Sequence, residues 1–249
     1  LLFTDADTVH APESIARAVG FAEAHGLALL SLTSRQLAAS FWERVIQPVV
    51  FGLLDQWYPL DRVNDPTSSR AAANGIFILA ARDAYEAVGG HRAVGADVLE
   101  DVALAHNVKR SGRRVVFADG SDLVAARMYA DLPAIRHGWT KNLYALRDRR
   151  PGRALWSAAE LFLTAVWPML ALGGAAVSGQ RAAMALAGVA TGVVLVAEVP
   201  FRARRGHDAA WSLTLPLGAL LGLSFLLEST IRGWLGLGVH WKGRHYARS

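Results

Sequence analysis

The chain contains no cysteine and has few charged residues for its length. None of its 249 residues is Cys, which excludes disulfides, thiolate metal sites and cysteine nucleophiles and leaves the redox compartment undetermined. Charged residues make up 19% of the chain and hydrophobic residues 53%, with a mean hydropathy of +0.25. This composition is too apolar for an ordinary soluble domain, so it indicates a membrane component.

The formal charge of +5 could favour binding to nucleic acid, to anionic lipid or to anionic substrates. Its placement separates these alternatives, because the basic clusters "RDRRPGR" (147–153) and "RARR" (202–205) stand next to apolar stretches. Basic residues beside membrane segments are typical of the cytoplasmic face of a membrane protein. We therefore expect a membrane partner and no nucleic-acid partner.

Three long apolar stretches follow residue 150. They are residues 154–177, 182–201 and 209–231, and each is long enough to cross about 30 Å of hydrocarbon. The basic loops predict a hairpin for the first two, with the preceding half in the cytoplasm. Three full crossings would place the basic tail outside, so we expect the third stretch, which contains Pro216, to be bent or re-entrant. The sequence thus predicts an α/β domain over 1–150 and a membrane domain over 151–249, with two to three transmembrane or re-entrant helices.

The first half alternates short apolar runs with helical spacing, which predicts a parallel α/β sheet. "LLFTDADT" at the start is expected to be a buried strand that ends in polar residues. The segment 36–60 is apolar on most faces, which fits either a core helix or a helix lying on the bilayer surface. The other expected elements are helices over 11–25, 84–90 and 99–112 and strands over 27–33, 76–80 and 113–119.

Asp5 and Asp7 stand at the carboxyl end of the first predicted strand, two residues apart. Residues i and i+2 of a strand point to the same side, and α/β sheets bind ligands at that end of their strands. Two hard oxygen ligands there suit Mg²⁺ or Mn²⁺, which would neutralise a diphosphate. A solvated strand-end turn is the alternative explanation, because a D-x-D triplet often occurs by chance.

Two further groups of polar residues could carry chemistry. Glu100 and Asp101 open the predicted helix 99–112, where they either cap the helix or supply a general base. In "IRHGWTKN" (135–142), Arg136 and Lys141 could bind a pyrophosphate and Trp139 could stack on an acceptor ring. An amphipathic helix lying on anionic lipid explains this second group equally well.

Taken in order, these motifs resemble those of the membrane-bound family 2 glycosyltransferases. "FTDADT" resembles the family's D-x-D, residues 73–112 resemble the acceptor-side block that contains the E-D pair, and "IRHGWTKN" resembles a reduced Q-x-x-R-W motif. Within this family the chain is similar to ceramide glucosyltransferases and to bacterial lipid glycosyltransferases, including those of hopanoid biosynthesis. "VHWKGRHY" (239–246) looks like the tail of that subgroup.

The resemblance implies a partial GT-A fold of the nucleotide-diphospho-sugar transferase type plus C-terminal transmembrane helices. It implies inverting transfer of a sugar from a nucleotide sugar, expected to be a UDP-sugar, to a membrane lipid acceptor. The expected location is the bacterial inner membrane, with the catalytic half in the cytoplasm. By position the resemblance gives Asp101 as the base beside Glu100, Asp5 and Asp7 as ligands of Mg²⁺ or Mn²⁺ and the diphosphate, Arg136 and Lys141 on the donor diphosphate, and Asn74, Gly75, His91 and Trp139 at the acceptor.

Two departures from the family qualify this expectation. His137 and Gly138 precede Trp139 where the full motif has an Arg, which argues against a processive polysaccharide synthase. The family's nucleotide-binding first strands precede D-x-D, whereas only "LLFT" does so here. We therefore expect either an N-terminally truncated chain or one that has lost donor binding, and inactivity or poor folding of this chain alone.

An alternative function is that of a non-catalytic membrane protein, either a transporter or an assembly subunit that retains a degenerate GT-A half. The acids Glu160, Glu198 and Glu228 lie within the apolar stretches, where ionisable residues commonly mark a transport path. Asp101→Asn separates the alternatives, because it should abolish transfer without affecting assembly.

Overall fold

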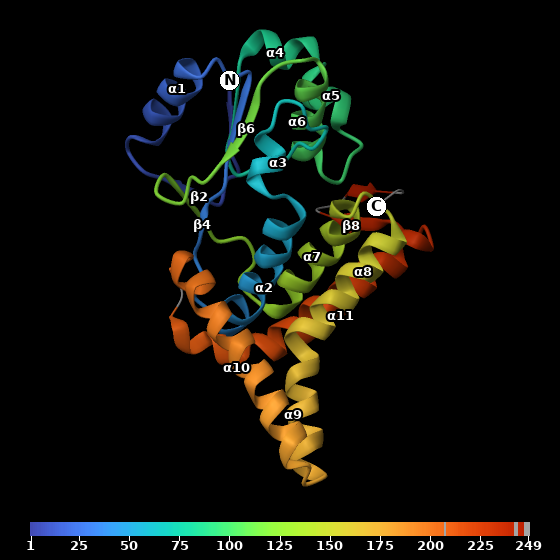
Figure 1. Ribbon diagram of the computed structural model, residues 1–249. Helices are drawn as coiled ribbons and strands as arrows, with labels where there is room; N and C mark the ends of the chain where they lie inside the picture. Colours follow the sequence, from blue (N-terminus) through green and yellow to red (C-terminus); the bar gives the residue numbers. More distant parts are fainter. Residues whose placement is uncertain (207, 242–243, 247–249) are drawn as a thin grey trace. The chain divides into compact units, whose positions relative to one another are not determined.

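The computed structural model describes residues 1–206, 208–241 and 244–246, and it divides into two compact units (Figure 1). The first unit contains residues 1–37 and 54–128, and the second contains residues 38–53 and 129–249. Segments 38–53 and 129–150 thus group with the apolar C-terminal part. The predicted functional boundary at residue 150 stays a prediction, because compactness does not reveal which part binds ligands.

The first unit contains two small sheets and five helices that lie wholly within it. Its strands are β1 (Leu2–Phe3), β2 (Thr8–His10), β3 (Leu29–Leu32), β4 (Arg35–Gln36), β5 (Ile78–Ala80), β6 (Val115–Ala118) and β7 (Val124–Ala126). Its helices are α1 (Ser14–Ala24), α3 (Leu60–Asn64), α4 (Arg82–Ala87), α5 (Gly90–Val94) and α6 (Glu100–Arg110). The mixed α/β character that the sequence predicts is confirmed.

The larger sheet is mixed and not parallel, which corrects the sequence prediction. Its strand order is β1-β5-β3-β6, where β5 is antiparallel to both of its neighbours and β3 is parallel to β6. β1 is therefore an edge strand that runs in the same direction as β3. The apolar run 76–80 predicts a buried strand but contains nothing that specifies its direction, which depends on the long connection from β3 through 33–77. The second sheet has the order β2-β7-β4.

The sheet residues divide between two apolar clusters because successive strand side chains point to opposite faces. Leu29 belongs to a cluster with Leu104 and Val108 of α6, whereas Leu30 belongs to a cluster with Ala18 of α1. All four residues of β3 are buried, as expected for a strand that is covered on both faces. This core fixes the strand ends on which the candidate site stands.

The second unit is helical in its described part, apart from a short hairpin. Its elements are α2 (Phe41–Trp57, whose last four residues belong to the first unit), α7 (Leu132–Leu146), α8 (Pro151–Leu161), η1 (Phe162–Val166), α9 (Trp167–Val177), α10 (Arg181–Arg204), η2 (Ala209–Thr214), α11 (Leu215–Trp234), β8 (Val239–Trp241) and β9 (Arg244–Tyr246). Val45, Ile46, Val49 and Val50 of α2 are buried, so this part of the segment 36–60 is core. Lys242 and Gly243 of the tail motif lie outside the described residues.

Three helical stretches of this unit are long and apolar enough to cross a membrane. They are Pro151–Val177, Arg181–Ala203 and Ala209–Trp234, with 27, 23 and 26 residues. The first contains η1, a π-helical segment between α8 and α9, directly before Trp167 and Pro168. The third begins as the 3₁₀ segment η2, and Pro216 occupies the first turn of α11, where it needs no backbone partner. Membrane association is thus supported by three apolar helices.

Candidate active site in the first unit

The candidate site lies where β1 ends and β5 begins. Asp5 follows β1, Asn74 and Gly75 precede β5, and Asp101 occupies the first turn of α6. The Gly75 N–H donates to Asp101 Oδ2 at 3.0 Å, and the Val102 N–H donates to Asp101 Oδ1 at 2.8 Å. The structure therefore brings residues from three distant parts of the chain to one strand end.

Gly75 separates the two carboxylates and leaves the space between them open. A Cβ built on Gly75 would lie 3.8 Å from Asp5 Oδ2 and 3.9 Å from Asp101 Oδ2. Both acids thus face the same point, which a side chain at this position would occupy. The lack of a side chain at Gly75 keeps room for a ligand atom between the two carboxylates.

Asp101 is only partly exposed, and its pKa is raised from an ordinary 3.8 to about 6. Burial is the main cause and the negative charge of Glu100 adds to it, while the hydrogen bonds from Val102 and Gly75 act in the opposite direction. Above pH 6 the carboxylate is mostly ionised and still has a raised affinity for a proton. This combination suits a general base that works near neutral pH.

The loop segment that carries Asn74 is tied to β3 on its other side. Ser31 Oγ accepts from the Asn74 N–H at 2.8 Å and donates to the Asn74 carbonyl at 3.2 Å. The Asn74 side-chain oxygen accepts from the Ile76 N–H at 3.2 Å. Asn74 thus shapes the loop that presents Gly75, and its predicted acceptor contact stays a prediction. Sequence reasoning missed Ser31, which has no signal other than its place in an apolar strand.

His10 is a second residue that sequence reasoning missed. Its Nε2 lies 2.9 Å from Thr4 Oγ1 and 3.0 Å from Thr8 Oγ1, on the two sides of the Asp5–Asp7 turn. Thr4 Oγ1 also lies 2.9 Å from the Ile76 carbonyl oxygen and Thr8 Oγ1 lies 2.7 Å from the Asp5 carbonyl oxygen, and the two hydroxyl oxygens lie 2.9 Å apart. His10 therefore fastens both ends of the acidic turn.

Asp5 and Asp7 are both exposed on this turn. No group of three or more His, Cys, Asp or Glu side chains with metal-site geometry occurs in the part of the chain that the structure describes. Two carboxylates are nevertheless a suitable protein share of a Mg²⁺ or Mn²⁺ site, since such ions usually keep waters and take further oxygens from a phosphate. Of this pair, Asp5 faces the space beside Gly75.

His91 lies close to β1 and not in the open. Its Nδ1 and the Tyr85 hydroxyl are 2.9 Å apart, and its ring packs edge-on against Phe3 with ring centroids 4.6 Å apart. Gly90 permits this arrangement, because it has φ +53° and a Cβ there would meet the Tyr85 ring at 2.4 Å. The predicted acceptor role of His91 stays a prediction.

The remaining predicted site residues belong to α7 of the second unit. Arg136 makes two hydrogen bonds to Glu228 of α11, from Nε at 2.8 Å and from Nη2 at 3.1 Å. Trp139 is 2% exposed and donates from Nε1 to Gln47 at 2.9 Å, so its ring is a packing element in this structure. Lys141 is half-buried on the same helix. Diphosphate binding by Arg136 and Lys141 and stacking by Trp139 stay predictions.

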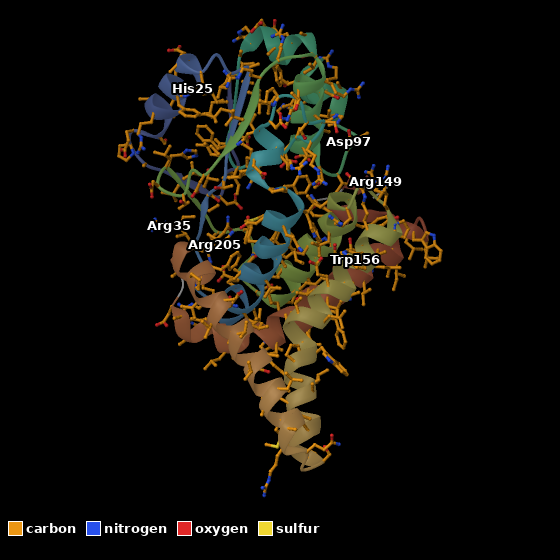
Figure 2. The ribbon with its side chains drawn as sticks, viewed as in Figure 1. His25, Arg35, Asp97, Arg149, Trp156 and Arg205 are labelled. Carbon is orange, nitrogen blue, oxygen red and sulfur yellow. The ribbon has the colours of Figure 1, made fainter. Side chains whose placement is uncertain are left out.

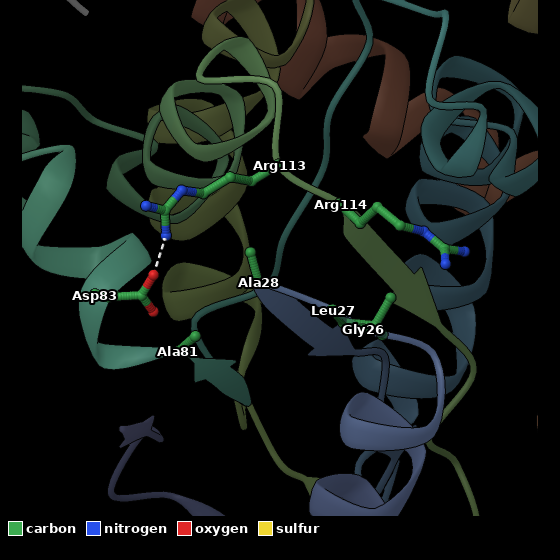
Figure 3. Close-up of a pocket in the computed structure, with 7 residues that line it drawn as sticks. All are labelled: Gly26, Leu27, Ala28, Ala81, Asp83, Arg113 and Arg114. Carbon is green, nitrogen blue, oxygen red and sulfur yellow. Dashed lines mark hydrogen bonds and ion pairs between the residues drawn. The ribbon is translucent and has the colours of Figure 1, made fainter.

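The first unit also has a shallow pocket of about 310 Å³ at the opposite end of the strands (Figure 3). It lies beside residues 26–28 before β3, Ala81 after β5 and Arg113 before β6. Arg113 is paired with Asp83 at 2.6 Å (Figure 3). Arg114 donates to the His25 carbonyl at 2.7 Å. These arginines hold neighbouring segments together, and none of the predicted site residues lies in this pocket.

No protein-family model and no curated protein matches the chain. The residues of the site and the apolar helices are therefore the features that bear on its function.

Proposed function

We propose that the chain is the catalytic part of a membrane-bound inverting glycosyltransferase that moves a sugar from a nucleotide sugar to a lipid hydroxyl. The observation that carries the proposal is the pair of carboxylates, Asp5 and Asp101, which face one point beside Gly75. A base and a turn whose carboxylates would hold a metal ion for the diphosphate, at the same strand end, are what such a transfer requires. The three apolar helices support a lipid acceptor, since they would hold the chain where the lipid is.

The proposed mechanism is a single displacement. The acceptor hydroxyl gives its proton to Asp101, its oxygen forms a bond to the anomeric carbon, and the bond between that carbon and the diphosphate oxygen breaks on the opposite face. Ionisation of Asp101 near pH 6 makes it available as the base, and the Gly75 N–H holds its Oδ2 in place. Mg²⁺ or Mn²⁺ held by Asp5 and Asp7 would supply positive charge to the leaving diphosphate.

The second candidate, a transporter or assembly subunit, has weaker support. Glu198 lies 3.0 Å from Arg202, and Glu228 is bonded to both Arg136 and Arg232. Acids that are already paired with arginines are typical of structural contacts, whereas a transport path needs acids that change partners. The ion pairs therefore favour the transferase.

The test is sugar transfer by the full chain in proteoliposomes. Nucleotide sugars labelled in the sugar are supplied with Mn²⁺ and a bacterial lipid extract, and the label in the organic phase is measured. Against the inactivity expected from the missing donor strands, we expect labelled lipid with the wild-type chain, because Asp5 and Asp101 face one point beside Gly75. For Asp101→Asn we expect a loss of about 10²- to 10⁴-fold, the range that a general base contributes. Transfer at the wild-type level by Asp101→Asn, or no labelled lipid from any donor, would contradict the proposal.

A further inference from the structure

The third apolar stretch, η2 and α11, is covered by neighbouring helices along most of its length. At its start, Trp211 lies 5.8 Å from Phe41 between ring centroids, and the Arg44 guanidinium lies 5.3 Å from the Trp211 ring. In its middle, Gly218 lies so close to α2 that a Cβ there would come within 2.3 Å of the Val45 carbonyl. Near its end, Ser229 Oγ accepts from the Tyr144 N–H of α7 at 2.9 Å, and Glu228 of α11 holds Arg136 of α7.

The covering helices are unsuited to the hydrocarbon core of a bilayer. α2 has 17 residues and α7 has 15, whereas a spanning helix needs about 20 that are mostly apolar. α2 carries Glu43 and Arg44, and α7 carries Arg136 and Lys141. Charged side chains at the bilayer centre are costly. α11 is therefore held outside the hydrocarbon core where it packs on α2 and, near its end, on α7, while α8 and η1 of the first apolar stretch cover it between these contacts.

The opposite face of the same stretch is exposed and almost purely apolar. Its exposed large side chains recur at helical spacing: Leu213 (73%), Leu217 (39%), Leu220 (46%), Ile231 (53%) and Trp234 (72%). Ser224, which stands between Leu220 and Ile231 along the chain, is the one exposed polar residue on this stripe. A helix with one face on charged protein elements and the other face apolar is suited to the boundary between water and lipid.

α10 has a different environment from α11. In the most apolar part of α10 only 6% of residues are buried by protein, against 39% in the stretch that contains α11. Figure 1 shows the hairpin of α9 and α10 extending away from α7 and α11, while α11 runs beside α7 and α8. The hairpin therefore has the exposure expected of a segment surrounded by lipid on nearly all sides.

We infer that α11 lies in the plane of the membrane, at the headgroup boundary, and that only the α8–α9 and α10 stretches cross the bilayer. The chain then crosses twice, and residues 235–237 remain on the side of the linker 147–153. This arrangement puts the linker, Arg202, Arg205 and Arg232 on one side, and leaves Arg181 alone at the hairpin tip. It thus satisfies the positive-inside rule, which three crossings would violate. The inference holds whether or not the chain is a transferase.

The natural absence of cysteine allows a direct test of the two crossings. Gly152→Cys in the first turn of α8, Ser178→Cys at the hairpin tip and Leu237→Cys after α11 are each reconstituted in sealed vesicles of one orientation. They are then treated with a membrane-impermeant maleimide. We expect positions 152 and 237 to react from the same side and position 178 from the other. Reaction of position 237 together with position 178 would overturn the in-plane helix, and reaction of all three from one side would overturn the crossing hairpin.

Measurements of immersion depth provide a second test, which does not depend on the side of the membrane that a position faces. Spin labels on Leu213→Cys, Leu220→Cys and Ile231→Cys report immersion depth through their collision rates with oxygen and a nickel chelate. All three residues lie on the exposed stripe, so an in-plane helix gives them similar depths near the headgroups. On α10, Leu186→Cys and Val193→Cys serve as matched controls, and their depths should differ. A maximum of depth at position 220 with shallow values at both ends would refute the inference.

Discussion

Asp101→Asn tests the electrostatics of the candidate site without any assumption about the substrate. The raised pKa means that the folded chain favours the neutral carboxyl, because burial and the charge of Glu100 outweigh the backbone hydrogen bonds to this carboxylate. For a group whose pKa is raised on folding, the associated stability is fully present below the unfolded pKa, near 3.8. It is lost as the pH rises through the folded pKa, near 6. The wild-type chain should therefore lose stability over this interval relative to a variant without the ionisable group.

The size of the effect follows from the shift. A change from 3.8 to about 6 corresponds to about 3 kcal/mol in total. Of this amount, about 1.4 kcal/mol should appear between pH 5 and pH 8, since about half of the loss of stability has already occurred at pH 5. Asparagine keeps one acceptor oxygen and loses the second, which costs about 1 kcal/mol at every pH and so leaves the pH dependence unchanged.

The assay is denaturant unfolding in detergent, followed by tryptophan fluorescence at pH 5, 6, 7 and 8. EDTA is present because a cation near the acidic turn would also favour the ionised carboxylate. The stability of Asp101→Asn relative to wild type should rise by about 1.4 kcal/mol across this range. Asp122→Asn, at an exposed carboxyl between β6 and β7, is the matched control for loss of one surface charge. A difference that stays constant with pH would refute the reasoning.

Substitutions at four further positions have definite expected outcomes. Glu100→Gln should move the acid limb of the transfer pH profile to lower pH, because it removes a charge that raises the pKa of the neighbouring base; an unmoved limb would contradict this cause. Gly75→Ala should keep the unfolding free energy within about 1 kcal/mol of the wild-type value. It should reduce sugar transfer at least tenfold, since its methyl group fills the space between the carboxylates. His10→Asn should weaken Mn²⁺ binding, measured by electron paramagnetic resonance, while His10→Gln, whose amide nitrogen reaches the Nε2 position, should retain it. Gly218→Ala should lower stability by about 2 kcal/mol in thermal unfolding, because its methyl group meets the α2 backbone.

The sequence was sufficient for the parts of the fold that depend on local patterns. The helix that begins at Glu100 and the three apolar stretches were predicted close to their observed positions, because apolar spacing, glycine stops and run length are local signals. Strand direction was not predictable in this way. β5 is inserted between β1 and β3 and runs against both, which depends on a connection of more than forty residues and not on its own sequence.

The site was predicted in part. The structure places Asp5, Gly75 and Asp101 at one strand end, which agrees with their selection from the sequence, although their roles stay predictions. Ser31 and His10 were missed, because a serine in an apolar strand and a histidine after a turn have no distinguishing pattern. Their contributions depend on hydrogen bonds to segments far away in the chain, which only the folded structure reveals.

The π-helical segment η1 has a consequence for how this membrane helix can change in evolution. A π turn contains one residue more than the α-turn it replaces, and each residue of an α-helix advances the next by about 100°. Exposed large side chains stand on both sides of the end of η1: Trp156 and Leu163 before it, and Trp167 and Leu170 after it. Loss of one residue within 162–166 would convert the segment to a regular α-helix and leave the two flanking helices intact. Deletion of a single residue should therefore be tolerated here, whereas the same change within α10 would rotate its lipid-facing side chains by more than a quarter of a turn.

Exposed tryptophans stand on both sides of this segment. Trp156, labelled in Figure 2, is 71% exposed on α8, and Trp167 is 53% exposed at the start of α9. Related chains aligned through this stretch should therefore vary in length at η1 while the spacing within α8 and within α9 stays fixed. The segment would then act as a site of length variation inside an otherwise uninterrupted helix.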